Sequence, residues 1–179
     1  QECNLRCTYC YGDGGEYSDS GKMSFKTAKE SVKYLLEHSG NHDKVSIVFF
    51  GGEPLLRFDL IEKVVKYANT LSKRYGKIAR FSITTNGTLL NKEISEFLKK
   101  HDFSITLSID GGPEVHNANR FYANKKGAYQ DTIERTENLR KTHRVSGRAT
   151  ITGSDVDIVK TFKHLNSLGL SSIHMSECV

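Results

Sequence analysis

The sequence predicts an α/β fold in which parallel strands, alternating with helices, form one curved sheet around a polar interior. Three observations lead to this prediction. Short β-branched segments alternate with helical stripes along the chain, polar residues occupy every second position of several strands, and the composition is that of an ordinary globular domain. A chain of 179 residues, 37% of them hydrophobic, can bury a core without disulfides or a structural metal.

Helical spacing of apolar residues predicts five helices. The first covers residues 24–39, with Ser24 as its N-cap. A helix needs apolar residues three or four positions apart to bury one face, and each of the other segments has that pattern. They are the stripe Ile61, Val64, Val65, Ala68 and Leu71, residues 92–100, the stripe Tyr129, Ile133, Thr136 and Arg140, and residues 156–168.

Five strands are predicted between these helices. Each is a short run rich in β-branched or aromatic residues, and each is separated from the next by a helical segment. Consecutive strands joined through a helix must run parallel, with right-handed crossovers. The predicted strands are residues 45–50, 80–85, 103–109, 148–152 and 172–176.

Alternation within the strands indicates that the sheet is curved. Parallel strands covered on both faces normally read as continuous apolar runs, whereas here Ser104, Thr106 and Ser108 alternate with Ile105 and Leu107. Three other predicted strands alternate in the same way. A curved sheet around a polar, ligand-holding lumen explains this better than a flat doubly wound sheet. The alternative is that these Ser and Thr side chains form local hydrogen bonds at a solvated edge.

Charge and hydropathy exclude several function classes. The net charge of +5 comes from 26 basic and 21 acidic residues that are interspersed, so no basic block indicates nucleic-acid binding. No apolar run approaches a membrane span, and the N-terminus lacks the pattern of a signal peptide. We therefore expect neither a nucleic-acid partner nor a membrane. Because the first residue is Gln1 and the informative residues follow at once, we expect an N-terminal part of the domain upstream.

Three of the four cysteines, Cys3, Cys7 and Cys10, lie within eight residues. In an intracellular chain such a cluster indicates a metal site rather than disulfides. Three thiolates on one loop can hold three irons of a 4Fe-4S cube and leave the fourth iron open to a substrate or cofactor. The alternative is zinc, which needs a fourth ligand, and the nearest histidines, His38 and His42, are roughly thirty residues away.

The cysteine segment CNLRCTYC, with Tyr9 before the third cysteine, resembles the signature of the radical S-adenosylmethionine (radical SAM) superfamily. The resemblance implies that Tyr9 belongs to the cofactor-binding residues. Gly51, Gly52, Glu53 and Pro54, directly after the first predicted strand, are similar to the GGEP segment of that family. The resemblance implies that backbone groups of this segment and Glu53 receive the methionine amino group. Glycine lets a backbone approach a ligand closely, and a carboxylate is a suitable partner for an ammonium group.

Two further segments resemble the branch of the family that modifies peptides and proteins, such as anaerobic sulfatase maturases and peptide-crosslinking enzymes. They are TNG, with Asn86, and SIDG, with Ser108. Ser108 and Arg120, twelve residues apart, match residues that contact the ribose or carboxylate of the cofactor. We expect Asn86, Ser108 and Thr150 to point into the lumen near the carboxyl ends of their strands, where ligands of parallel βα folds bind.

The resemblance implies a partial (β/α)6 barrel, with residues 1–179 as a radical SAM core domain. Its first strand is expected upstream of Gln1, and a C-terminal domain with auxiliary clusters is expected beyond Val179. It also implies two cofactors, a 4Fe-4S cluster and S-adenosylmethionine. The expected reaction is reductive cleavage to a 5'-deoxyadenosyl radical, which abstracts hydrogen from a peptide or protein substrate. The sequence assigns no catalytic residue.

The chemistry further implies an electron donor, such as a flavodoxin or ferredoxin, and a reducing cytoplasm. Two alternatives stay open, a radical SAM enzyme that acts on a small molecule and a zinc-stabilised binding module. His116 precedes Arg120 in a turn or short helix, where a packing or surface role is preferred to that of a catalytic acid. Cys178, a lone cysteine on a strand, is interpreted as a core residue rather than a ligand or catalytic thiol.

Overall fold

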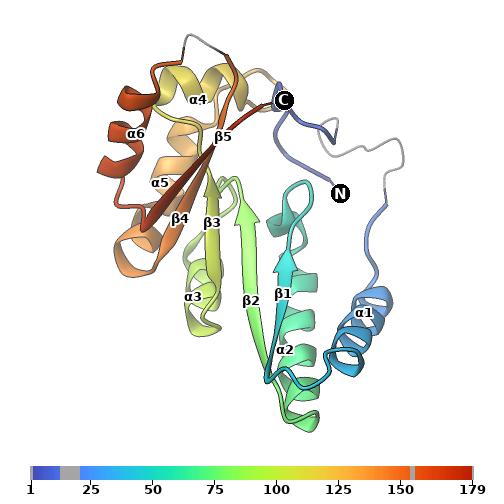
Figure 1. The fold of residues 1–179 in the computed structure, drawn as a ribbon. Helices are drawn as coiled ribbons and strands as arrows, with labels where there is room; N and C mark the ends of the chain where they lie inside the picture. Colours follow the sequence, from blue (N-terminus) through green and yellow to red (C-terminus); the bar gives the residue numbers. More distant parts are fainter. Residues whose placement is uncertain (1, 13–20, 154–155, 179) are drawn as a thin grey trace.

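The computed structural model describes residues 2–12, 21–153 and 156–178, and in these ranges strands and helices alternate as predicted (Figure 1). The strands are β1 Lys44–Phe49, β2 Ile78–Thr85, β3 Ser104–Ser108, β4 Val145–Ile151 and β5 Ser172–Glu177. The helices are α1 Phe25–Glu37, the short 3-10 helix η2 Pro54–Arg57, α2 Phe58–Arg74, α3 Lys92–Lys100, α4 Pro113–Asn119, α5 Tyr129–Thr142 and α6 Ile158–Ser167.

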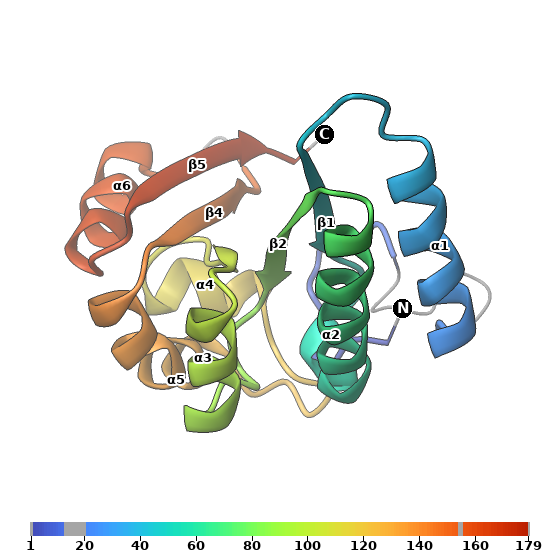
Figure 2. The same cartoon turned by 90° about the horizontal axis from the view of Figure 1, so that it is seen from below.

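All five strands belong to one parallel sheet, and their order in space, β1-β2-β3-β4-β5, is their order in the sequence. Each crossover therefore continues in the same direction, which places the connecting helices on one face. Figure 2, seen from below, shows the strands as an arc with the helices around its outside. This is the predicted partial barrel, and not a flat sheet with helices on both faces.

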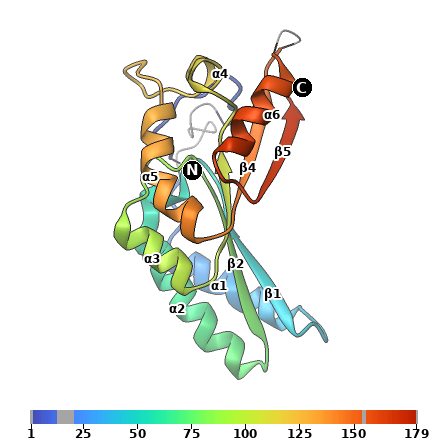
Figure 3. The same ribbon diagram turned by 90° about the vertical axis from the view of Figure 1, so that its left-hand side faces the viewer.

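The core lies between the sheet and the helices on its convex face, where α2, α3 and α5 stack along one side of the sheet (Figure 3). Phe81 and Phe103 stack at a ring separation of 5.4 Å and fix the packing of β2 against the start of β3. The residues that strand alternation directs toward the helices are almost fully buried. They include Phe81, Ile83, Ile105, Leu107, Ala149 and Ile151.

Side-chain caps define several helix starts. Ser24 accepts a hydrogen bond from the backbone N–H of Thr27 at 3.0 Å, so the predicted N-cap is confirmed. Asn91 caps α3 in the same way. Asp157 caps α6, so that helix begins at Ile158, two residues later than predicted. None of the helices within the described residues is long and apolar enough to cross a membrane.

The concave face of the sheet is not covered by helices within the described ranges, and polar residues line it as predicted. Ser82, Thr84, Thr106, Ser108 and Thr150 are partly exposed on this open face, and cross-strand register places them side by side. The predicted strand 148–152 begins three residues earlier, at Val145. The residues not predicted include Gly147, which has the side chain of Leu170 packed directly over it.

Candidate functional site

The predicted site residues gather at the carboxyl ends of the strands. The loops after β1, β2 and β3 meet there, and the N-terminal segment with the cysteines lies across them (Figure 1). A parallel sheet brings all of its strand ends with this polarity to one edge, so segments far apart in sequence become neighbours.

The cysteine segment is fastened on two sides. On one side Leu5 forms an antiparallel bridge with Tyr122, and the N–H of Arg6 donates to the carbonyl of Phe121 at 2.7 Å. On the other side the Asn4 amide donates to the hydroxyl of Thr88 at 2.8 Å. The Leu5 side chain is fully buried. The loop is therefore an integral part of the fold rather than an appended tail.

Cys3, Cys7 and Cys10 are free and partly buried. The pKa of Cys7 is raised to about 11, mainly by burial; Arg120 opposes this rise, and Cys3, Asp110 and Cys10 contribute to it. Within the described ranges, no three Cys, His, Asp or Glu side chains are arranged to hold a metal ion. The donor set nevertheless fits an iron-sulfur cluster, because three thiols share one anchored loop and a cation would relieve the repulsion between their thiolates.

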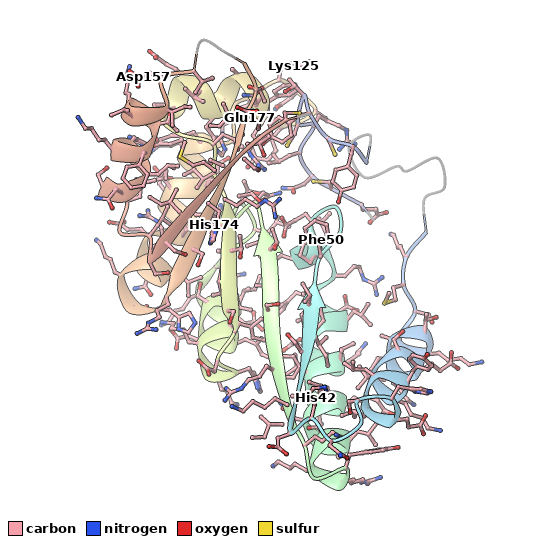
Figure 4. The ribbon with its side chains drawn as sticks, in the orientation of Figure 1. His42, Phe50, Lys125, Asp157, His174 and Glu177 are labelled. Atoms are coloured by element: carbon pink, nitrogen blue, oxygen red, sulfur yellow. The ribbon has the colours of Figure 1, made fainter. Side chains whose placement is uncertain are left out.

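The histidines that a zinc site would need are remote. His42 lies before β1, at the opposite end of the sheet from the cysteine segment (Figure 4). His38 caps the end of α1 and stacks on Tyr34, with ring centroids 3.9 Å apart. Neither residue can supply the fourth ligand that a closed tetrahedral zinc site requires.

Asp110 connects Tyr9, Arg120 and Thr150. Its fully buried carboxylate accepts hydrogen bonds from the Tyr9 hydroxyl at 2.6 Å, from Nε of Arg120 at 2.9 Å and from the Thr150 N–H at 3.0 Å. The Arg120 guanidinium also lies over the Tyr9 ring, 5.3 Å from its centroid. Burial lowers the pKa of Arg120, but Asp110, Tyr9 and Cys7 together raise it by more, so the pKa lies above its ordinary value and the arginine is charged.

This cluster brings together three residues that were predicted for the site. Asp110, which joins them, was not among the predicted site residues. Tyr9, Arg120 and Thr150, all predicted for the cofactor site, each donate a hydrogen bond to Asp110, Thr150 through its backbone N–H. The SIDG segment could have indicated Asp110, because this acid ends a predicted strand ten residues before Arg120. Asp110 is thus a positioning residue for the predicted cofactor site.

Glu53 is buried, with 3% of its surface exposed. Its Oε1 accepts hydrogen bonds from the Leu55 N–H at 3.0 Å and the Thr85 hydroxyl at 2.8 Å, and its Oε2 accepts from the Asn86 N–H at 2.8 Å. Burial raises the pKa of Glu53 to about 7 in spite of these bonds. The carboxylate therefore joins the end of β1 to the end of β2, in addition to the predicted role toward an ammonium group. Before it, Gly51 has a φ of 149°, which favours glycine.

Asn86 binds the cysteine loop rather than facing an open lumen. Its amide donates to the Asn4 side chain at 2.9 Å, and its oxygen accepts from the N–H and hydroxyl of Thr88. Only 6% of Asn86 is exposed. Ser108 and Thr150 do lie on the open face, half-buried, at the positions that alternation predicts.

The sequence predicts a packing or surface role for His116. His116 is fully buried, so the packing role is confirmed and a surface position is wrong. Burial lowers its pKa to about 4, and its Nδ1 accepts from the Asp110 N–H at 3.4 Å.

Cys178 is exposed, so the expectation of a core residue is wrong. It follows the last residue of the edge strand β5, and alternation directs it away from the helices.

Comparison of the sequence with known protein families identifies the family of this chain. The sequence profile of the Radical SAM superfamily matches residues 1–165. The chain belongs to the radical SAM superfamily. This is a superfamily of enzymes that use a 4Fe-4S cluster and S-adenosylmethionine, in agreement with the predicted cofactors.

Individual radical SAM relatives cover most of this chain. The uncharacterized protein MJ0907 of Methanocaldococcus jannaschii is 37% identical over 96% of this chain and 57% of its own length. A cysteine-type anaerobic sulfatase-maturating enzyme of Clostridium perfringens is 34% identical over 80% of this chain and 39% of its own length. Other relatives have names of small-molecule enzymes, such as an AdoMet-dependent heme synthase of Methanosarcina barkeri.

Among solved structures, native anSMEcpe with bound AdoMet and the Kp18Cys peptide superimposes with a TM-score of 0.87 at 28% identity, over 99% of this chain and 48% of that one. The likeness confirms the partial-barrel fold and supports the peptide-modifying branch. The radical SAM chain described here spans about half the length of the proteins it matches.

Proposed function

We propose that this protein is a radical SAM maturase of a peptide or protein. Cys3, Cys7 and Cys10 would hold the 4Fe-4S cluster. When bound, the cluster and S-adenosylmethionine supply a one-electron reductive cleavage to methionine and a 5'-deoxyadenosyl radical, which takes a hydrogen atom from the substrate. The observation that carries the proposal is the anchored cysteine loop, which meets Glu53 on one side and Asp110 on the other at one edge of the half-barrel.

The chain's own residues would bind and orient the S-adenosylmethionine. Glu53 supplies negative charge for its ammonium group, beside a backbone that Gly51 and Gly52 leave unobstructed. Arg120 suits its carboxylate, because a guanidinium offers a second edge of N–H donors even while one edge binds Asp110. Asp110 holds Arg120 and Tyr9 in place before the ligand arrives, which reduces the ordering cost of binding.

The open polar face would hold the substrate. Ser108 and Thr150 lie on it next to the Asp110 cluster, within reach of a ligand at the carboxyl ends of the strands. The sulfatase-maturating relative and the peptide-bound neighbour support a peptide or protein rather than a small molecule as the substrate. The electron donor would be a flavodoxin or ferredoxin, and the protein would work in the cytoplasm, where thiolates remain reduced.

The test is anaerobic reconstitution of the full-length protein with iron and sulfide, followed by dithionite and S-adenosylmethionine. Mass spectrometry should detect 5'-deoxyadenosine with the wild type and not with Cys7→Ala, which removes one cluster ligand. Cys178→Ala is the matched control, because Cys178 is exposed at the end of β5, and it should retain the activity. A colourless protein that binds zinc and forms no 5'-deoxyadenosine would contradict the proposal and support a zinc-stabilised module.

A further inference from the structure

The open face of the sheet presents an arginine that the proposed cofactor site does not use. In β4, Val145, Gly147, Ala149 and Ile151 are buried toward the helices, whereas Arg148 is exposed on the opposite face. Within the described residues, no carboxylate forms an ion pair or hydrogen bond with its guanidinium. An arginine that has no carboxylate partner in the described part of the chain, on a concave face, is available to a ligand.

Arg148 lies directly beside the proposed cofactor site. In the parallel register it is the partner of Ser108 on β3 and of His174 on β5. Thr150, whose N–H donates to Asp110, is two residues further along the same face, about 7 Å away at the usual rise of a strand. Figure 4 shows His174 on β5 over the concave side of the sheet. A substrate group held by Arg148 would therefore lie close to Ser108 and Thr150, two residues of the proposed cofactor site.

The charge of the open face favours an anion. Two acids described next to it are paired with arginines, Asp102 with Arg80 at 3.1 Å and Asp110 with Arg120 at 2.9 Å. Toward the amino ends of the strands lies a hollow of about 930 Å³, to which the open face contributes Ser104, Thr106 and Ser146 and the helix-covered face contributes Phe81 and Ile105. Its lining also includes Arg80, Lys141 and Arg144, of which Arg80 is paired with Asp102 and Lys141 with Glu137. Among the described residues, Arg144 and Arg148 have no carboxylate partner, so this part of the open face attracts negative charge.

We propose that Arg148, with His174 beside it, binds a carboxylate of the substrate, so that the protein acts on peptides with Asp or Glu close to the modified residue. This inference rests on the proposed function and specifies its substrate class. A guanidinium fork binds both oxygens of a carboxylate in one plane. A single fork balances one negative charge. The face at this level consists of strand side chains rather than the helix N-termini that typically bind phosphates.

The experiment compares two synthetic peptide pools on the full-length, cluster-loaded enzyme. Each peptide has a central cysteine among Gly and Ala residues, and one neighbouring position in turn is Asp in the first pool and Asn in the second. Consumption of each peptide is followed by mass spectrometry. We expect wild type to prefer the Asp pool by roughly 10- to 100-fold in kcat/KM, the range for a charge-assisted pair. Arg148→Gln should bring the ratio of the two pools close to one.

Two more variants complete the design. Arg135→Gln, which removes the same charge from an exposed position of α5, should keep the preference for Asp. Arg148→Glu should reverse it toward a third pool with Lys at the varied positions. Iron content that matches the wild type shows that each variant is folded and loaded. Equal use of the Asp and Asn pools by the wild type, or a preference that survives Arg148→Gln, overturns the inference.

Failure of the proposed function is seen separately, as the absence of both 5'-deoxyadenosine and peptide consumption in the wild type. In that case the same pools, labelled with a fluorophore, are titrated against the cluster-loaded protein. Tighter binding of the Asp pool that Arg148→Gln abolishes supports the anion site. Equal binding of the two pools overturns it.

Discussion

At residue 110 a buried carboxylate accepts hydrogen bonds from three separate parts of the chain. Tyr9 comes from the cysteine loop, Arg120 from the end of α4 and Thr150 from β4. A buried carboxylate is stable only when its charge is balanced and its lone pairs are used, and Arg120 satisfies both needs. The consequence is that the cysteine loop and the arginine proposed for the cofactor are positioned by one residue that touches neither a metal nor, in our proposal, the cofactor.

Glu53 predicts a dependence of stability on pH. Its folded pKa of about 7 lies above its ordinary value of 4.5, so the folded state favours the protonated form. The resulting stability is fully present below pH 4.5 and is lost as the pH rises through 7. Relative to Glu53→Gln, the wild type should lose roughly 3 kcal/mol across this window, which urea unfolding of the full-length protein at pH 5 and pH 8 would measure.

The free energy of unfolding of Glu53→Gln also differs from that of the wild type because the glutamine amide cannot accept all three hydrogen bonds. This difference does not change with pH. Glu62→Gln, at an exposed position of α2, is the control and should leave the profile of the wild type unchanged. Parallel profiles of wild type and Glu53→Gln would show that the Glu53 carboxylate is ionised in both folded and unfolded states across this range.

At the scale of elements, the turns after the strands decide where the site residues lie. Gly87 follows Asn86 at the end of β2 with a φ of 78°, and a Cβ there would lie 2.7 Å from Leu107 and 2.8 Å from Thr136. The turn therefore lies pressed against both β3 and α5. This close contact keeps the backbone of Asn86 near Thr132, whose hydroxyl donates to the Asn86 carbonyl at 3.0 Å.

Gly87→Ala should accordingly destabilise the protein by about 3 kcal/mol, from backbone strain together with the displacement of two packed side chains. Gly76→Ala is the matched control. Gly76 also has a positive φ, 66°, but a Cβ added there would meet nothing within 4 Å, so the substitution should cost only about 1 kcal/mol. Thermal unfolding of both variants measures the difference. Equal costs would mean that the contacts around Gly87 give way without penalty.

On the scale of the whole molecule, the half-barrel has one face for packing and one for ligands. The two faces are distinguished by alternate residues of the same strand. Leu107 is fully buried under the helices, and the adjacent Thr106 is partly exposed on the open face. Because all crossovers run in one direction, no helix returns to cover the open side within the described residues.

Adjacent alanine substitutions test this division. Leu107→Ala should cost about 3 kcal/mol, because it leaves a cavity in the core, whereas Thr106→Ala should stay within about 0.5 kcal/mol of the wild type. The free energy of unfolding of the two variants in urea is the measurement. A comparable loss for both would show that the open face is also packed.

Most of the fold could be predicted from the sequence, because local periodicity reports directly on secondary structure. All five strands and the helices α1, α2, α3, α5 and α6 lie where apolar spacing predicts them. The errors occur where tertiary contacts decide. β4 is longer than predicted because residues 145–147 pair with β3, and Cys178 is exposed because β5 is an edge strand in the described sheet.

The sequence alone determined the cofactor chemistry of this protein. The spacing of Cys3, Cys7 and Cys10 and the GGEP segment are local features, which can be recognised without knowing which segments are neighbours in the fold. Only the tertiary structure decided how the site is assembled. It showed that Asp110 holds Tyr9 and Arg120, that Glu53 joins two strand ends, and that Arg148 is without a partner on the open face among the described residues. These facts depend on which strand ends become neighbours in a parallel sheet, and that information lies in the pairing of strands rather than in any one segment.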